Sequence, residues 1–377
     1  MVSSLSASFV LPLTASLLVA AATTAALAQP TITDIGSGVS PGPFAGSIIA
    51  LSADGNAVTG QAFNDTGTTA FRWTRSGGLQ DIGSLPGGSN GAGTGISANG
   101  SVICGAEFSL SAVYRWTSAG GFVDIGSLPG PQGFFVANGI SGDGSVIVGG
   151  SGGGPFGGAS AFRWTSVSGM QRLGTLPGGT GAQAIAISTN GLAITGFSGS
   201  ATGDRAVRWT DATGIQDLGV LPGGTNSTAV AISGDGATIT GSGTTADGVR
   251  AFRWNESTGM QALAILPGYT GSRGYGVSGN GSAIVGTCFD ANDLSTAFLW
   301  TPSLGVVDLN AYLPTLGLDL TGWTIDLVKA ISADGSVIAG GGVFNGESRS
   351  FVISGIPTPG AATLLGVAAL FARRRHR

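Results

Sequence analysis

Histidine is almost absent from this chain of 377 residues, since the only one, His376, is the next-to-last residue. Histidine is the usual base of hydrolytic triads and a frequent zinc ligand. A Ser-His dyad or a histidine-based zinc site is therefore excluded from the rest of the sequence. Glutamate is also scarce, with only Glu107, Glu256 and Glu347. Glycoside hydrolysis by two carboxylates would have to use these residues or aspartates.

Charge is also low. Charged residues make up 10% of the chain, whereas about a quarter is usual for soluble proteins. The net charge of −4 argues against nucleic acid as a partner. No glycine motif lies between an expected strand and an expected helix, so no phosphate-binding loop and no cofactor are expected.

Glycine is abundant, with 69 residues, and it belongs to a repeat with three parts. The first part is a Ser-x-Asp/Asn-Gly turn that recurs seven times, beginning at Ser52, Ser97, Ser141, Ser188, Ser233, Ser278 and Ser332. The second is an aromatic strand of the Phe-Arg-Trp type, beginning at Phe71, Tyr114, Phe162, Val207, Phe252, Phe298 and Phe351. The third part reads Asp81-Ile82-Gly83 or a close relative. A period of about 45 residues with several short strands is typical of propeller blades.

The order of the three parts predicts how the array closes. The third part comes first in the chain, at Asp34, and nothing like it follows the last aromatic strand at Phe351. A linear array would leave unpaired strand edges at both ends. We therefore expect an all-β fold: a seven-bladed β-propeller of four-stranded antiparallel blades, closed by an N-terminal strand that completes the last blade. Within each blade we name the strands a to d from the axis outward.

Two glycine-containing turns support this assignment. Asp-Gly and Asn-Gly after strand a are strong hairpin signals. A second glycine recurs five residues after each tryptophan position and predicts a left-handed bulge between strands c and d, at Gly78, Gly121, Gly169, Gly214, Gly259 and Gly305. The two cysteines, Cys104 and Cys288, fall in repeats that are not neighbours, which predicts buried free thiols.

Three segments are expected. Residues 1–28 have the apolar run and the Ala26-Leu27-Ala28 site of a signal peptide, with an uncleaved anchor as the alternative. Residues 29–354 form the propeller. Residues 355–377 form a sorting or membrane segment with a basic tail, marked by Pro357, Pro359, Arg373, Arg374 and Arg375. The alternative for this last segment is a floppy basic tail.

The repeat resembles the bacterial extracellular HAF repeat at Thr69-Ala70-Phe71, Ser160-Ala161-Phe162 and Leu218-Gly219-Val220-Leu221, although every copy lacks the eponymous histidine. The C-terminus resembles a PEP-CTERM sorting signal in which Thr358 replaces the glutamate. The resemblance implies export in a Gram-negative-type bacterium and processing by an exosortase-type enzyme. It also implies at least transient membrane attachment through the C-terminal segment, and residence in the cell envelope, at the cell surface or in the extracellular matrix. The resemblance does not imply any particular reaction or ligand.

Residues that recur in every repeat are expected to be structural. Asp and Asn interchange in the Ser-x-Asp/Asn-Gly turn, which indicates turn geometry. The strand-c tryptophans indicate packing between blades. Arg72 and Asp81 form a possible cross-strand pair, but a shift of one residue decides whether they share a face.

Residues that break the repeat are the candidates for function. They concentrate at the end formed by the b–c and d–a loops, where aromatic side chains with an arginine suit a carbohydrate or peptide. The candidates are Phe134, Phe135, Tyr269, Arg273, Tyr275 and Trp323. The alternative is that the aromatic residues only cap the blades. Asp290 and Asp293 supply oxygen ligands for a possible calcium site.

The sequence therefore predicts a non-enzymatic, exported propeller of the cell surface or extracellular matrix. It would bind polysaccharide or protein through the b–c/d–a loop end and would need no cofactor. Two alternatives stay open. One is an extracellular glycan hydrolase or lyase with Asp290 and Asp293 as the first suspects, and the other is a structural spacer without a ligand.

Overall fold

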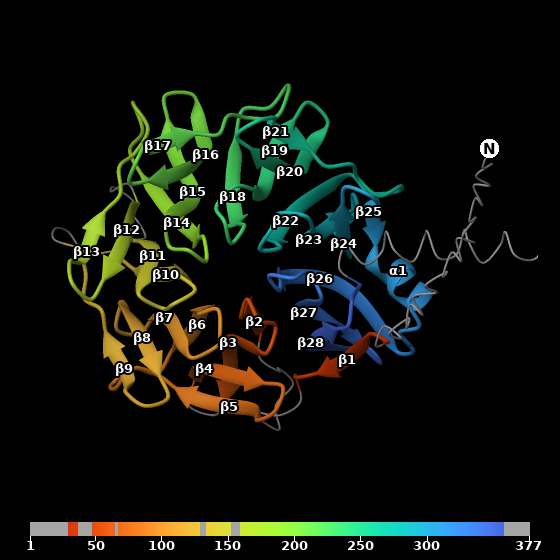
Figure 1. The fold of residues 1–377 in the computed structure, drawn as a ribbon, viewed down its shortest axis with the longest axis horizontal. Coiled ribbons are helices and arrows are strands. Elements are labelled where there is room, and N and C mark those ends of the chain that lie inside the picture. Colours follow the sequence, from red (N-terminus) through yellow and green to blue (C-terminus); the bar gives the residue numbers. More distant parts are fainter. Residues whose placement is uncertain (1–28, 37–46, 65–66, 129–132, 152–158, 358–377) are drawn as a thin grey trace, which may run out of the picture.

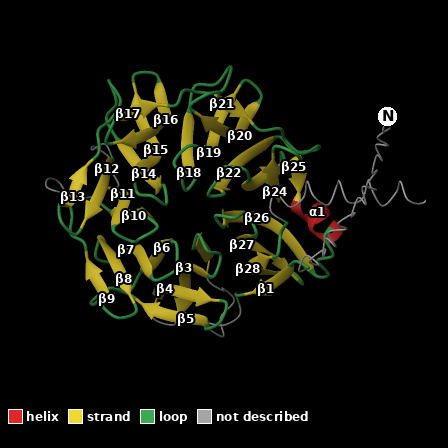
Figure 2. Cartoon of the chain, viewed as in Figure 1, coloured by secondary structure: helices red, strands yellow, loops and turns green. Residues whose placement is uncertain are grey.

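The computed structural model describes residues 29–36, 47–64, 67–128, 133–151 and 159–357. They form seven four-stranded sheets arranged around a central axis (Figures 1 and 2). The expected all-β, seven-bladed propeller is confirmed. The predicted signal peptide and residues 358–377 of the predicted sorting segment, including Pro359 and Arg373 to Arg375, lie outside the described residues.

Each blade is a four-stranded antiparallel sheet. The strands nearest the axis are β2 (Ser47–Leu51), β6 (Gly91–Ile96), β10 (Phe135–Ile140), β14 (Ala182–Ile187), β18 (Ser227–Ile232), β22 (Gly271–Val277) and β26 (Trp323–Ile331). The second strands are β3 (Ala57–Asn64), β7 (Val102–Glu107), β11 (Val146–Ser151), β15 (Ala193–Ser200), β19 (Ile239–Thr245), β23 (Ile284–Phe289) and β27 (Val337–Phe344). The third strands are β4 (Gly67–Thr74), β8 (Ala112–Thr117), β12 (Ser160–Thr165), β16 (Gly203–Thr210), β20 (Gly248–Asn255), β24 (Ser295–Thr301) and β28 (Glu347–Ser354). The outer strands are β5 (Gly78–Gly83), β9 (Gly121–Asp124), β13 (Gly169–Arg172), β17 (Gly214–Asp217), β21 (Gly259–Ala262), β25 (Gly305–Asp308) and β1 (Thr31–Asp34).

The two ends of the chain meet in the last blade, as expected. β1 pairs antiparallel with β28, with Thr31 opposite Ser354 and Asp34 opposite Phe351. In Figure 1 the red β1 lies beside the blue β28. We number the blades 1 to 7 from β2–β5 to β26–β28 with β1.

The turns between third and outer strands have the expected left-handed glycines. Gly78 has a φ of 67° and pairs with Thr74. The equivalent glycines have φ values from 64° to 68°, where side chains other than glycine are strained. In blade 1 the register places Phe71, not Arg72, opposite Asp81, so the possible Arg72–Asp81 pair does not share a face.

Aromatic residues of the third strands fill the spaces between blades. Phe71 and Trp73 of blade 1 are buried in one cluster with Val337 and Val352 of blade 7. This arrangement supports the packing role expected for the recurring tryptophans. Cys104 and Cys288 are both free and buried, as expected, so they contribute apolar bulk rather than a covalent link.

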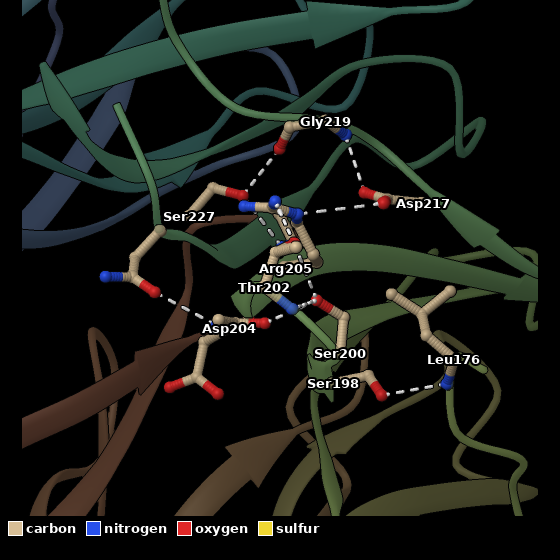
Figure 3. Close-up of polar contacts among 12 residues, drawn as sticks. Leu176, Ser198, Ser200, Thr202, Asp204, Arg205, Asp217, Gly219 and Ser227 are labelled. Atoms are coloured by element: carbon tan, nitrogen blue, oxygen red, sulfur yellow. Dashed lines mark hydrogen bonds and ion pairs between the residues drawn. The ribbon is translucent and has the colours of Figure 1, made fainter. Parts of the chain in front are cut away.

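Polar contacts at the loop end also tie neighbouring blades together. Between blades 4 and 5, Ser227 Oγ donates to the Gly219 carbonyl at 2.6 Å and accepts from the Ala206 amide at 2.9 Å. Arg205 Nε lies 3.8 Å from a carboxylate oxygen of Asp217 (Figure 3). The Ser227 bonds join blade 5 to blade 4, and the Arg205–Asp217 pair links the third and outer strands within blade 4.

One short helix, α1 (Leu309–Thr315), occupies the insertion between blades 6 and 7. The Asp308 side chain accepts the Asn310 amide and caps it, while Leu309 and Leu313 are buried in the core. The sequence did not predict this helix. In the part of the chain that the structure describes, no helix is long and apolar enough to cross a membrane.

Candidate functional site

The strand nearest the axis carries a β-bulge in every blade, three residues before the turn serine. In blade 1, for example, pairing between β2 and β3 skips Ile49. A bulge leaves its extra residue out of the ladder and redirects its side chain. The seven residues bulged at this position line the central channel and form what we call the bulge ring: Ile49, Thr94, Asn138, Ile185, Val230, Tyr275 and Lys329. β26 has a second bulge, at Asp326, outside this ring.

The polar members of the bulge ring occur as two neighbouring pairs. The innermost strands contact one another in sequence, and β26 contacts β2, so the order around the channel is the order of the blades. Thr94 and Asn138 are neighbours in blades 2 and 3, and Tyr275 and Lys329 in blades 6 and 7. Aliphatic residues of the remaining three blades separate the two pairs.

The channel is apolar below the bulge ring. The next residue in each strand is alanine or glycine, and the one after it is aliphatic: Leu51, Ile96, Ile140, Ile187, Ile232, Val277 and Ile331. The cavity between the bulge ring and this aliphatic ring measures about 470 Å³. This volume lies within the range of about 300–1,000 Å³ typical of small-molecule sites.

At the other end, the Ser-x-Asp/Asn-Gly turns narrow the channel. Backbone hydrogen bonds link neighbouring turns, as from the Ala98 amide to the Gly142 carbonyl at 2.9 Å and from the Gly142 amide to the Thr189 carbonyl at 2.9 Å. The cavity on this side of the aliphatic ring is only about 140 Å³. A ligand of useful size would therefore occupy the larger cavity, on the side of the b–c and d–a loops.

The turn aspartates have the structural role that the sequence indicated. Asp143 accepts from the Ser141 hydroxyl at 2.6 Å and from the Ser145 amide at 3.0 Å. Asn99 holds its turn with the same two kinds of contact. In Asp143 the Ser141 hydrogen bond, followed by those from Ser145, lowers the pKa of the carboxyl to about 2. This carboxylate is engaged in shaping a turn, away from the channel.

Lys329 is the one charged residue that lines the larger cavity, and it is also the only lysine of the whole chain. Burial lowers the pKa of its ammonium group from the ordinary value of 10.5. No carboxylate in the described part of the chain forms an ion pair with it. Asp326 lies three residues earlier on β26, but it is not part of the channel lining.

Two further ring members are held by hydrogen bonds to the backbone of the next blade. The Asn138 side-chain amide donates to the Ala184 carbonyl at 2.8 Å. The Thr94 hydroxyl donates to the Ala137 carbonyl and lies 3.3 Å from the Cys104 carbonyl. Both side chains are therefore fixed at the channel wall before any ligand arrives.

The structure disperses the six residues proposed from the sequence. Tyr275 lines the channel. Phe134 is exposed by 58%, whereas Phe135 is exposed by only 4% and belongs to the core between blades. Tyr269 packs against a core cluster of blades 5 and 6, and Arg273 stacks 4.8 Å above the ring of Phe289. Trp323 packs against Phe344, with ring centroids 4.9 Å apart.

Asp290 and Asp293 form a tight turn. One Asp290 carboxylate oxygen accepts the amides of Asn292 at 2.8 Å and Leu294 at 2.9 Å. Asp293 adopts a φ of 61°, which aspartate tolerates better than most residues. Within the described ranges, no group of three or more His, Cys, Asp or Glu residues is placed to hold a metal ion.

Sequence reasoning missed Lys329, Asn138 and Thr94. A signal for them exists, because each lies three residues before a turn serine, at the same position in the repeat as Tyr275. Four of the seven residues in this slot are polar, whereas the following two slots hold only small and aliphatic residues. The side chains that differ in polarity from blade to blade therefore lie in one layer of the channel, the bulge ring.

No family model and no curated protein matches the chain. Among solved structures, the fold is similar to an oligogalacturonate lyase from Vibrio parahaemolyticus, with a TM-score of 0.54, 9% identity, and coverage of 83% of this chain and 89% of that one. It is also similar to a prolyl endopeptidase, with a TM-score of 0.53, 10% identity and 74% of this chain covered. TolB from Acinetobacter baumannii gives a TM-score of 0.46 at 16% identity over 66% of this chain. The chain spans 42% of the endopeptidase's length and 62% of TolB's.

These comparisons contradict the sequence-based prediction of a non-enzymatic surface propeller that binds through its loops. That prediction took the architecture, together with the lack of familiar motifs, as typical of a binding module. The same architecture occurs in a lyase and an endopeptidase, so it does not separate binding modules from enzymes. At such low identities the likeness concerns the fold alone, and the channel has to be interpreted from its own residues.

Proposed function

We propose that the propeller holds a small organic anion in its central channel, with Lys329 as the counterion. The observation that carries this proposal is the placement of the chain's only lysine in an apolar cavity of about 470 Å³ whose lining contains no carboxylate. Surface lysines are common and carry little information. A single lysine in the channel, in a chain with so few charged residues, is a specific feature.

The energetics of burial support the same proposal. A half-buried ammonium such as that of Lys329, without an ion-pair partner in the described residues, has lost part of its hydration and gained no compensating charge. The lowered pKa of Lys329 reflects this cost. A carboxylate entering the channel would supply the missing charge in a medium where Coulomb attraction is stronger than in water. The aliphatic residues below the bulge ring would bury the apolar part of the ligand.

Calorimetric titration with hexanoate and benzoate tests the proposal, with hexylammonium as the cationic comparison. We expect both acids to bind and the cation not to bind. Lys329→Met keeps the apolar stem and removes the charge, so the acids should lose roughly 2 kcal/mol or more of binding free energy. Arg273→Met is the matched control, because Arg273 is an exposed cation outside the channel lining. Unchanged affinity in Lys329→Met would contradict the proposal.

We also propose that the chain is exported and processed at both ends. The signal-like residues 1–28, the HAF-like repeats and the Pro-Thr-Pro tail with its basic cluster support this. The processing partner would be an exosortase-type enzyme, and the mature protein would reside in the envelope, at the surface or in the matrix. Mass spectrometry of the full chain, expressed in a bacterium with and without such an enzyme, checks both termini. Intact termini in the cytosol of both strains would contradict export.

A further inference from the structure

The polar members of the bulge ring present hydrogen-bond acceptors on one side of the channel. The Ala184 carbonyl oxygen can accept a hydrogen bond but cannot donate one. The Asn138 side-chain nitrogen, which lies 2.8 Å from this oxygen, is therefore the donor and faces Ala184. The Asn138 carbonyl oxygen has no hydrogen bond among the described residues. The Thr94 hydroxyl directs its hydrogen to the carbonyls of Ala137 and Cys104, so toward the channel Thr94 can only accept.

The other polar pair presents donors. Lys329 has three N–H donors and no acceptor, and the Tyr275 hydroxyl on the neighbouring blade can also donate. Neither side chain forms a hydrogen bond or ion pair within the described ranges. Ile49 separates this pair from Thr94 on one side of the ring, and two aliphatic residues separate it from Asn138 on the other. The channel is therefore polarised, with donors at blades 6 and 7 and acceptors at blades 2 and 3.

We propose that the ligand is a hydroxy carboxylate with an apolar spacer, an inference that rests on the proposed function. Its carboxylate pairs with Lys329 and Tyr275, and its hydroxyl donates to Asn138 Oδ1 and Thr94 Oγ1. The spacer crosses the channel above the aliphatic ring. A terminal ammonium fits less well than a hydroxyl, because the neutral acceptors at blades 2 and 3 would not compensate its lost hydration.

The first test needs only the unmodified protein. Carboxylates of increasing chain length are titrated calorimetrically, each compared with its ω-hydroxy and ω-amino derivatives. We expect the hydroxy acid of fitting length to bind about tenfold more tightly than the plain acid, which corresponds to one or two neutral hydrogen bonds. The ω-amino derivative of the same length should bind no more tightly than the unsubstituted carboxylate. Equal affinity of hydroxy and plain acids at every length would overturn the inference.

Variants of the proposed acceptor residues then show which side chains cause the tighter binding of the hydroxy acid. Thr94→Val preserves shape, and Asn138→Leu removes the acceptor oxygen. In either variant the hydroxy acid should lose a large part of its tenfold advantage while the plain acid keeps its affinity. Arg273→Met should keep the full advantage. Thermal unfolding checks that each variant is folded, and a full preference in both folded variants would overturn the inference.

The two proposals fail in different ways. If no carboxylate binds, or if Lys329→Met binds carboxylates normally, the proposed function itself is wrong and the inference falls with it. If carboxylates bind through Lys329 but the hydroxyl makes no difference, only the hydroxy-acid inference is wrong.

Discussion

The guanidinium of Arg72 donates its Nε hydrogen to the carbonyl oxygen of Gly100 in the next blade, across 2.9 Å. Asp81, the expected partner of Arg72, instead pairs with Phe71 and points to the opposite face. Its carboxylate accepts the Gly83 amide at 2.8 Å. The recurring arginine thus links neighbouring blades, whereas the recurring aspartate shapes the turn at the end of its own blade.

Replacement of Arg72 therefore affects stability through Gly100. Arg72→Met leaves the buried Gly100 carbonyl without its donor, which should cost about 1–3 kcal/mol in free energy of unfolding. Asp81→Asn keeps an oxygen that can accept the Gly83 amide and should change stability by no more than about 0.5 kcal/mol. Urea unfolding of both variants measures the difference. Equal losses in the two variants would indicate a direct Arg72–Asp81 pair and contradict this interpretation.

The register that separates these two side chains was not readable from the sequence. A strand has a side-chain period of two residues, so a shift of one residue moves every side chain to the other face. The bulge glycine Gly78 made that shift ambiguous. The same limit applies to Phe134 and Phe135, which look equivalent in the sequence but are exposed by 58% and 4%.

Most of the architecture could be predicted because each local signal recurs. The turn serines, the third-strand aromatic residues and the displaced copy at Asp34 together predicted the blades and their closure. The site was harder, because Lys329 enters the channel only through a bulge in β26. A bulge changes the direction of a side chain without a residue type that marks it, so only the spacing of three residues to the turn serine could have indicated Lys329. The helix α1 was missed because its seven residues, with Pro314 inside, carry little helical pattern.

Ile35 connects the first and last blades and offers a test of closure. Its side chain is exposed by 6% and belongs to the cluster that joins Val337 of blade 7 to Phe71 of blade 1. Ile35→Ala should lower the free energy of unfolding by about 2–4 kcal/mol through lost burial and an unfilled cavity. Thr31→Ala, at the exposed start of β1, should change it by no more than about 0.5 kcal/mol.

Thermal and urea unfolding compare the substitution at Thr31, in β1, with the one at Ile35, directly after it. Light scattering adds a second readout, because loosening of β1 would expose the edge of β28 to pairing with other molecules. We expect aggregation on heating to begin earlier in Ile35→Ala than in Thr31→Ala. Indistinguishable unfolding of the two variants would mean that the N-terminal strand does not hold the ring together.

Asp143 should contribute to stability in a pH-dependent manner. Its pKa is about 2 in the folded protein, against an ordinary value of 3.8. The contribution is therefore present above about pH 4 and is lost as the pH falls toward 2. Asp143→Asn keeps the turn, as Asn99 does in blade 2, so its stability should vary less over this range. Melting temperatures measured at intervals through the range show the difference between the two proteins.

Asp143→Ala serves as the comparison for the turn itself. It removes the acceptor for both the Ser141 hydroxyl and the Ser145 amide, so it should be destabilised at every pH. A melting curve for Asp143→Asn that follows the unmodified protein throughout the acid range would show that the carboxyl is not held in its charged form.

Lys329 should make stability depend on pH in the alkaline range, with the same sign as Asp143 does in acid. Burial lowers its pKa in the folded protein below 10.5, so between these two values the unfolded chain binds the additional proton. The free energy of unfolding of the ligand-free protein should therefore rise with pH across this window. Lys329→Met should lack the rise. Asp326 and Arg273, the other charged residues on β26 and its neighbour β22, remain unchanged in this comparison.

Burial favours the neutral form of Lys329, whereas a bound anion favours its charged ammonium form. The pH dependence of the affinity for an anion therefore tests the site. The carboxylate of hexanoate favours the ammonium form, so binding should take up protons at pH values near the lowered pKa of the free protein. Its affinity should then fall as the pH rises, beginning below the pH at which an exposed lysine would lose its charge. Calorimetry in buffers with different ionisation enthalpies measures the proton uptake directly. A pH-independent affinity up to the ordinary lysine pKa would show that the anion is held by something other than Lys329.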